Sequence, residues 1–228
     1  MNRLVRLFGT SIGRKAVVAA TGALLVAFLL VHAAGNLLIL KGADALNGYA
    51  DWLQGHPLLW VFRIGLLALL AAHVTTTHQL LKKNRAARPV HYRQLNKSGG
   101  GLPARLMLWS GLTILGFVGF HLLHLTLRWI GPQPAQLMDA ADRIDVHALL
   151  ITGFSDPLIA SIYLFAILLL AMHLVHALQS MVQTLGFNHE SYQPLIRLLT
   201  VVVSLSIAAG FASIPLLIQF GMLGSVGG

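Results

Sequence analysis

Five long stretches of the chain are apolar and contain no acidic residue, and this pattern limits the possible folds more than any other feature. They cover approximately residues 16–40, 58–81, 106–127, 157–185 and 198–220. Each stretch is long enough to cross about 30 Å of hydrocarbon as an α-helix, because a helix rises about 1.5 Å per residue. Only 10% of all residues are charged and 56% are hydrophobic, which leaves too little polar surface for a soluble globule. The sequence therefore predicts an all-α integral membrane protein, with residues 1–228 forming a single membrane domain of five transmembrane helices.

The first apolar stretch follows a basic N-terminal segment, an arrangement that signal peptides share. It runs without a charge from Ala16 to Leu40 and contains His32. The apolar core of a signal peptide is shorter, at about 7–15 residues. We therefore expect a retained transmembrane helix rather than a cleaved leader.

The charged residues between the apolar stretches predict an orientation. The N-terminal flank and the connectors at residues 82–105 and 186–197 together carry twelve basic residues and one acid. The other two connectors and the start of the second stretch carry four basic residues and six aspartates. The positive-inside rule then places the N-terminus in the cytoplasm and the C-terminus outside. Membrane topology accounts for the net charge of +9, so we expect no nucleic-acid partner.

The connectors themselves carry few structural signals. Residues 41–56 are polar and predict a short exposed connection. Residues 128–156 form the longest loop, and residues 136–151 predict a short interfacial helix within it. The chain has no cysteine, so any iron–sulfur centre or disulfide that its function requires must belong to a partner.

Four of the five apolar stretches contain histidine. The histidines are His32, His73, His78, His121, His124, His173 and His176. An ionisable side chain in the apolar part of a membrane is costly and by default indicates a functional site.

The positions of these histidines, measured from the outer end of each stretch, place them at two depths. His32 and His121 lie eight and seven residues from the outer end, which corresponds to about 11 Å. His73 and His173 lie fifteen and sixteen residues from it, which corresponds to about 23 Å. The first and third helices thus supply an outer pair, and the second and fourth an inner pair. A four-helix bundle can bring such side chains to its axis, where bundles hold cofactors.

Two imidazoles at one depth are typical of a haem iron with an axial ligand on each face. Such an iron is six-coordinate and suits electron transfer rather than oxygen binding. We therefore expect the first four helices to form a bundle that binds two haems, about 12 Å apart in height. The alternative for any one histidine is a hydrogen bond to a neighbouring helix without a cofactor.

Depth alone leaves the choice within two histidine doublets open. His78 and His176 are also nearly level with each other, so they could replace His73 and His173 as the inner pair. His124 has no partner at its depth on the first helix. For His78, His124 and His176 we expect hydrogen bonds to haem propionates, backbone or water, or contact with a partner subunit. The remaining histidines lie outside the apolar stretches and are expected to be solvated.

Several short motifs are spread in order over nearly the whole chain. They are Ser11-Ile12-Gly13-Arg14-Lys15 with Thr21-Gly22, His32 with Gly35-Asn36, His73 with Asn84-Arg85-Ala86-Ala87-Arg88-Pro89, Phe120-His121-Leu122-Leu123-His124, Phe154-Ser155-Asp156-Pro157, and His173 with Gln183-Thr184-Leu185-Gly186. In this combination they resemble the cytochrome b558 type of membrane anchor in succinate dehydrogenase and fumarate reductase, the complex II superfamily. Each motif is weak alone, and their combination is fairly specific.

The resemblance implies two haem b groups and docking of a flavoprotein subunit and an iron–sulfur subunit on the cytoplasmic face of the cell membrane. It also selects the first histidine of each doublet, because the last ligand of similar subunits precedes a glycine at the spacing that separates His173 from Gly186. By position, His73 and His173 would bind the proximal haem, and His32 and His121 the distal haem. Some dihaem fumarate reductases have a glutamate where this chain has Ala171, so a proton path through such a glutamate is not expected.

The resulting hypothesis is a subunit of an oxidoreductase complex that transfers electrons between succinate, oxidised on partner subunits, and a membrane quinone. The resemblance implies menaquinone, and the opposite direction would make a quinol:fumarate reductase. Candidate quinone-site residues are His56 and Arg63 near the distal haem, and Ser11 and Arg14 near the cytoplasmic face. The alternatives are a dihaem cytochrome b of another membrane dehydrogenase and, less favoured because the apolar stretches lack acids, a histidine-lined ion transporter.

Overall fold

The computed structural model describes residues 10–87, 101–134, 136–187 and 189–223. Within these residues it is built from helices, and five of them are long and apolar enough to cross a membrane, as the sequence predicts. The protein is therefore an all-helical, multi-pass membrane protein. Arg88-Pro89 of the basic motif, His91 and the glycine-rich part of the same connector lie outside the described residues, as do Arg3 and Arg6 of the N-terminal flank.

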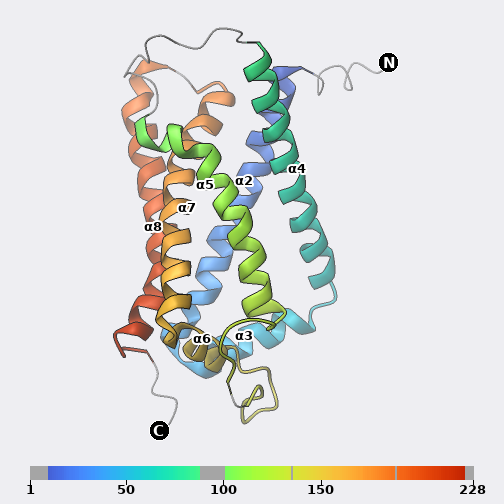
Figure 1. The fold of residues 1–228 in the computed structure, drawn as a ribbon, viewed down its shortest axis with the longest axis vertical. Helices are drawn as coiled ribbons and strands as arrows, with labels where there is room; N and C mark the ends of the chain where they lie inside the picture. The colour runs from blue at the N-terminus through green and yellow to red at the C-terminus, as the bar shows by residue number, and fades with distance from the viewer. Residues whose placement is uncertain (1–9, 88–100, 135, 188, 224–228) are drawn as a thin grey trace.

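The five long helices run along the long axis of the molecule (Figure 1). They are α2 (Ser11–Asn36), α4 (Leu59–Ala86), α5 (Gly101–His121), α7 (Pro157–Thr184) and α8 (Gln193–Gln219). Two short helices, α3 (Ala43–Gly55) and α6 (Val146–Ser155), lie together at one end, and short 3₁₀ or π turns extend α2, α5 and the start of α8 (Figure 1).

Local capping residues set where two of the long helices begin. The Thr10 hydroxyl accepts a hydrogen bond from the backbone N–H of Gly13 at 3.0 Å, so α2 starts at Ser11, ahead of the apolar stretch. Asp156 accepts from the N–H of Leu158 at 2.8 Å, and Pro157 occupies the first helical position of α7. Both arrangements satisfy backbone donors that a helix N-terminus leaves free.

The segment expected to be an exposed connection, residues 41–56, is instead largely the helix α3. Its Asn47 is buried, with 1% of its surface exposed. The Asn47 amide donates to Asp145 at 3.0 Å and accepts from the backbone N–H of His147 at 3.0 Å. These partners lie far along the chain, beyond two further long helices, so no local pattern near Asn47 could predict its burial. The interfacial helix expected at residues 136–151 also begins later, because Asp145 caps α6 through the N–H of Ala148.

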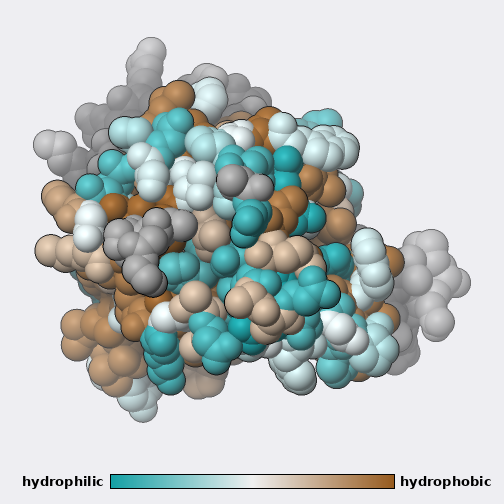
Figure 2. Space-filling view, turned by 90° about the horizontal axis from the view of Figure 1, so that it is seen from below, coloured by the Kyte–Doolittle hydropathy of each residue, from teal (hydrophilic) through white to brown (hydrophobic). Residues whose placement is uncertain are grey.

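An ion-pair cluster fixes the loop between α5 and α6 against α3. The Arg143 guanidinium donates to Asp44 at 2.8 Å and lies 2.8 Å from a carboxylate oxygen of Asp139. Hydrogen bonds from Arg143 lower the pKa of Asp139 to about 2. The backbone N–H of Arg143 has the larger effect, and its guanidinium has the next largest. The hydrogen bonds of the Arg143 guanidinium to Asp139, first, and to Asp44, second, raise the pKa of Arg143. Figure 2 shows hydrophilic residues spread over this end of the molecule, which suits a surface in contact with water.

The long helices pack as two pairs with a fifth helix alongside. Helix α4 packs along α2, and α5 packs along α7. Contacts between α2 and α7 join the two pairs, and α8 packs against α7 and α2 (Figure 1). Each pair carries one histidine at each of the two depths, so the pairing of helices decides which imidazoles can meet.

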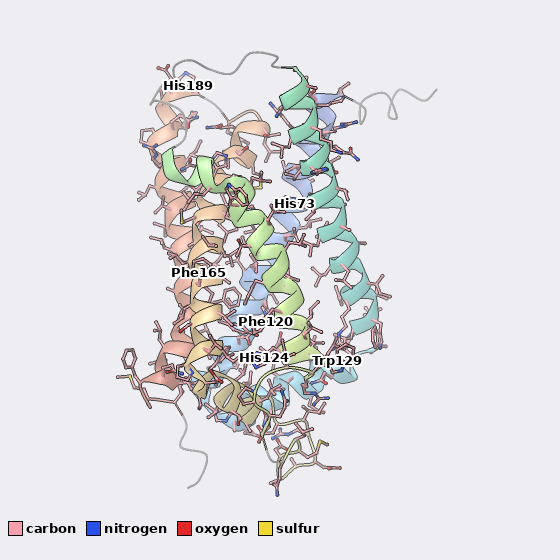
Figure 3. The ribbon with its side chains drawn as sticks, in the orientation of Figure 1. His73, Phe120, His124, Trp129, Phe165 and His189 are labelled. Atoms are coloured by element: carbon pink, nitrogen blue, oxygen red, sulfur yellow. The ribbon has the colours of Figure 1, made fainter. Side chains whose placement is uncertain are left out.

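Large tryptophan side chains mark the end of the bundle that carries α3. Trp52, Trp60 and Trp129 are 62%, 66% and 74% exposed, and Trp129 is labelled at this end in Figure 3. Tryptophan is enriched where a membrane protein passes from hydrocarbon to water, so these residues agree with an interface at this end.

Candidate functional site: two histidine pairs between helices

The structure brings His32 of α2 and His121 of α5 together at one level of the bundle. Their imidazole ring centroids lie 6.0 Å apart, and the ring planes are nearly perpendicular, at 89°. His32 also stacks on Phe28 and tilts against Phe211 of α8, with centroid distances of 5.2 and 5.6 Å. The Nδ1 atom of His121 lies 3.3 Å from the hydroxyl of Tyr163 on α7. The outer pair is thus enclosed by aromatic side chains from its own and neighbouring helices.

His73 of α4 and His173 of α7 form the second pair, at the other level. The two imidazoles are near enough to interact electrostatically. The Nδ1 atom of His73 lies 3.0 Å from the hydroxyl of Thr21 on α2, and Nδ1 of His173 lies 3.2 Å from the hydroxyl of Ser110 on α5. Figure 3 shows His73 well away from the end where His124 lies. Each histidine of this pair is therefore held through Nδ1 by the helix it packs against.

Glycines allow both of these imidazoles to approach the neighbouring backbone. A Cβ atom on Gly22 would lie 3.4 Å from Cε1 of His73, and one on Gly111 would lie 3.4 Å from Cε1 of His173. A Cβ alone would thus touch the ring, and a side chain that extends further toward the ring would displace it. The two contacts are equivalent, since each glycine directly follows the hydroxyl residue that bonds the same ring.

The same residue spacing recurs on α2 and α5. Thr21-Gly22 precedes His32 on α2 at the spacing at which Ser110-Gly111 precedes His121 on α5. This spacing is about three helical turns, so the hydroxyl residue and the histidine of each helix lie on nearly one face, about 16 Å apart along the axis. Because Thr21 contacts His73, the two histidine levels are separated by about this distance, which exceeds the separation of about 12 Å expected from the sequence.

The structure distinguishes the members of the two inner doublets. His73 and His173 each have a hydroxyl partner on the adjacent helix, and each ring lies against a glycine of that helix. His78 is exposed and His176 is half-buried, and within the described part of the chain no hydrogen bond reaches either ring. In these two inner doublets, only the first histidine is thus positioned by a second helix.

The four residues considered for a quinone site lie at two different ends of the structure. His56 accepts from the N–H of Leu58 at 3.2 Å, and its ring packs 5.7 Å from that of Trp52. The Arg63 guanidinium lies 5.1 Å from the ring of Trp60. Ser11 and Arg14 occupy the first turn of α2, where Ser11 is exposed and Arg14 half-buried. Among the described residues, none of the four hydrogen-bonds to a paired histidine.

The dimensions of the outer pair fit a shared iron. Each bond between an imidazole nitrogen and a metal is about 2 Å, so two rings on opposite sides of one iron have centroids about 6 Å apart. The observed separation of 6.0 Å between His32 and His121 is compatible with this requirement, and equally with a direct edge-on contact of the two rings. The described residues contain no group of three or more His, Asp or Glu placed to hold a metal ion. Donors that occur only in pairs suit a haem, whose porphyrin supplies the other ligands.

Three partners of the paired histidines were not among the residues predicted from the sequence. They are the hydroxyl residues Thr21, Ser110 and Tyr163, which contact His73, His173 and His121. The hydroxyl–glycine pair that recurs at one fixed spacing before a histidine could have indicated the first two. No comparable pattern surrounds Tyr163. A comparison of the chain with protein-family models, with curated proteins and with solved structures found no match.

Proposed function

We propose that this chain is the dihaem cytochrome b membrane anchor of a succinate:quinone oxidoreductase, the complex II superfamily. His32 and His121 would hold the distal haem, and His73 and His173 would hold the proximal haem. The single observation that carries the proposal is that His32 of α2 and His121 of α5 meet between the two helix pairs, with ring centroids 6.0 Å apart. Three of the four rings also have Nδ1 beside a hydroxyl oxygen.

The hydroxyl contacts give the imidazoles the form that a metal needs. An axial histidine binds through Nε2 while Nδ1 carries a proton, and a partner that accepts this proton fixes both tautomer and ring orientation. The Thr21 hydroxyl donates its own proton to the carbonyl of Val17 at 2.8 Å, and that of Ser110 donates to the carbonyl of Met107 at 3.2 Å. Both oxygens are thus left to accept from the histidines.

Each bound haem would supply an iron that gains and loses one electron reversibly. The chain would orient the ligands, exclude water from them and keep the two centres about 16 Å apart along the helices. With the basic connectors in the cytoplasm, the level of His73 lies nearer that face. A flavoprotein subunit and an iron–sulfur subunit would dock there and carry the dicarboxylate chemistry. Menaquinone would exchange electrons at the membrane.

The quinone site is proposed at one of two places. His56 and Arg63 lie at the α3–α4 corner, on the side of the distal pair, and both carry groups that could bond a quinone carbonyl. Ser11 and Arg14 lie at the opposite end of α2. Substitution of each residue, followed by the KM for a soluble menaquinone analogue, separates the two places.

The test of the function is purification of the intact protein with its partners in detergent. We expect a reduced-minus-oxidised spectrum with a b-type band, about two haems per chain and a co-purifying flavin-containing subunit. Absence of haem would exclude the proposal and leave a histidine-lined transporter as the alternative. Two haems without a flavoprotein would indicate the dihaem cytochrome of another dehydrogenase.

A further inference from the structure

Tyr163 of α7 contacts two imidazoles at once. Its hydroxyl oxygen lies 3.3 Å from Nδ1 of His121 and 3.0 Å from Nδ1 of His124. Its ring is buried, with 5% exposed, and packs edge-on against Phe117 and Phe154 at centroid distances of 4.9 and 4.7 Å. The packing holds the hydroxyl between the two histidines.

His124 is fully buried, with no exposed surface, on the π turn Leu122–Thr126 that follows α5. A Cβ atom on Gly131 or on Gly153 would lie 2.9 Å from its Nε2 atom, so the backbone closes around the ring (Figure 3 shows His124 at this end). Within the described residues, Nε2 has no hydrogen-bond partner. A buried polar atom without a partner destabilises the folded state, and a π turn often marks a functional site. The burial of His124 therefore requires a reason beyond packing.

The protons available to Tyr163 and the two histidines provide that reason. The Tyr163 hydroxyl has one proton and cannot donate to both rings. If it donates to His121, then His121 carries its proton on Nε2 and cannot bind a metal through that atom. If it donates to His124, its oxygen accepts the Nδ1 proton of His121, and Nε2 of His121 is free to bind.

The hydroxyl groups beside the inner pair show which role His124 would fill beside the outer pair, that of proton acceptor for a hydroxyl group. Thr21 and Ser110 donate their hydroxyl protons to backbone carbonyls of their own helices, which commits their oxygens to accept from a histidine. A tyrosine hydroxyl lies too far from its own backbone to do so, and among the described residues the acceptor within reach of Tyr163 is Nδ1 of His124. His124 would therefore accept the hydroxyl proton of Tyr163, as the helix carbonyls accept those of Thr21 and Ser110.

We propose that His124 and Tyr163 are positioning residues for His121, with His124 taking the tyrosine proton so that the phenol oxygen accepts from His121. The proposal rests on the proposed role of His121 as a haem ligand. The chain of bonds runs in one direction, from His121 Nδ1–H to Tyr163 and from Tyr163 O–H to His124. It selects the metal-binding tautomer of His121 and strengthens electron donation from its Nε2 to the iron.

The experiment compares four variants of the purified, haem-loaded complex by redox titration and by electron paramagnetic resonance of the low-spin haems. Tyr163→Phe removes the hydroxyl, and His124→Leu removes the acceptor with a side chain of similar size. His124→Asn places an amide oxygen near the position of Nδ1. Thr21→Val is the matched control, because it removes the hydroxyl partner of His73 at the other level.

We expect Tyr163→Phe and His124→Leu to raise the midpoint potential of the same haem and shift its resonance, and the other haem to keep wild-type values. His124→Asn should restore both quantities toward wild type, and Thr21→Val should move the other haem instead. Two results would overturn the proposal: wild-type haem signals in His124→Leu, or no recovery in His124→Asn. Equal shifts of both haems would also overturn it, since they indicate a general loss of structure. A wild-type complex without haem would contradict the proposed function rather than this role of His124.

Discussion

Ser110 on α5 places its hydroxyl oxygen 3.2 Å from Nδ1 of His173 on α7. The contact between Thr21 and His73 repeats this arrangement on α2 and α4, at 3.0 Å. Both contacts join helices within a pair. The hydroxyl residues therefore determine where the inner histidines point.

Removal of either hydroxyl should weaken the inner haem site selectively. Thr21→Val and Ser110→Ala should each lower affinity for one haem about ten- to hundredfold, because the acceptor that orients the ligand is lost. Haem-to-protein stoichiometry after incubation with apomyoglobin, which takes up loosely held haem, measures this. Thr200→Val is the control, since Thr200 is buried on α8 and its hydroxyl donates to its own helix at Arg197. Equal haem loss in the control would argue against a specific role.

Within the doublets, we predict that only the first histidine is a ligand. His73→Ala and His173→Ala should each abolish the same haem, while His78→Ala and His176→Ala should retain two. The reason is that, among these four histidines, His73 and His173 have a hydroxyl partner and lie against a glycine on the adjacent helix. Pyridine haemochrome analysis of the purified variants counts the haems. Loss of a haem in His176→Ala with none lost in His173→Ala would reverse the assignment.

Two glycines on α5 provide a matched pair for testing whether the close contact between Gly111 and the His173 ring is required. In Gly111→Leu the new side chain would meet His173, because a Cβ at this position already lies 3.4 Å from the ring. We expect loss of the inner haem. Gly116 has no atom within 4 Å of the position of a Cβ, so Gly116→Leu should keep two haems and a wild-type spectrum. The prediction fails if the two variants behave alike.

The close contact between Gly131 and His124 should make an alanine substitution at Gly131 more destabilising than one at Gly186. Gly131 has φ +80°, and a Cβ there would lie 2.7 Å from Cδ2 of His124. Gly186 has a similar φ of +96° with open space around it. Gly186→Ala should cost about 1–3 kcal/mol from backbone strain alone. Gly131→Ala should cost more because the clash adds to the strain. Unfolding of both variants in mixed micelles measures the difference, and equal costs would show that the contact with His124 yields without penalty.

Acid should release the ion-pair cluster at the end of the molecule that carries α3. Arg143 lowers the pKa of Asp139 from its ordinary 3.8 to about 2, so the carboxylate stabilises the fold at pH values above 3.8. This contribution is lost as the pH falls from 3.8 through about 2, where the folded protein takes up the proton. The melting temperature of the wild type should exceed that of Asp139→Asn near neutral pH and converge with it in this window. A difference that persists at still lower pH would contradict the assignment.

The histidine levels illustrate how far the sequence alone leads. His32 and His121 lie near the same ends of their apolar stretches, so their positions in the sequence predict that they share a level. The positions cannot show which ring edge faces which neighbour, because that depends on how each helix is rotated about its axis. Tyr163 became a partner of His121 only through such a rotation, from a position 42 residues away in the chain.

The five membrane-spanning helices follow from the sequence itself, since the length and apolarity of consecutive residues decide whether a segment can cross a bilayer. The helix α3, the burial of Asn47 and the hydroxyl partners of the histidines were decided by the tertiary structure. Thr21 and His73 are 52 residues apart, and Ser110 and His173 are 63 residues apart. Such contacts depend on the relative position of whole helices, which no local pattern of residues specifies.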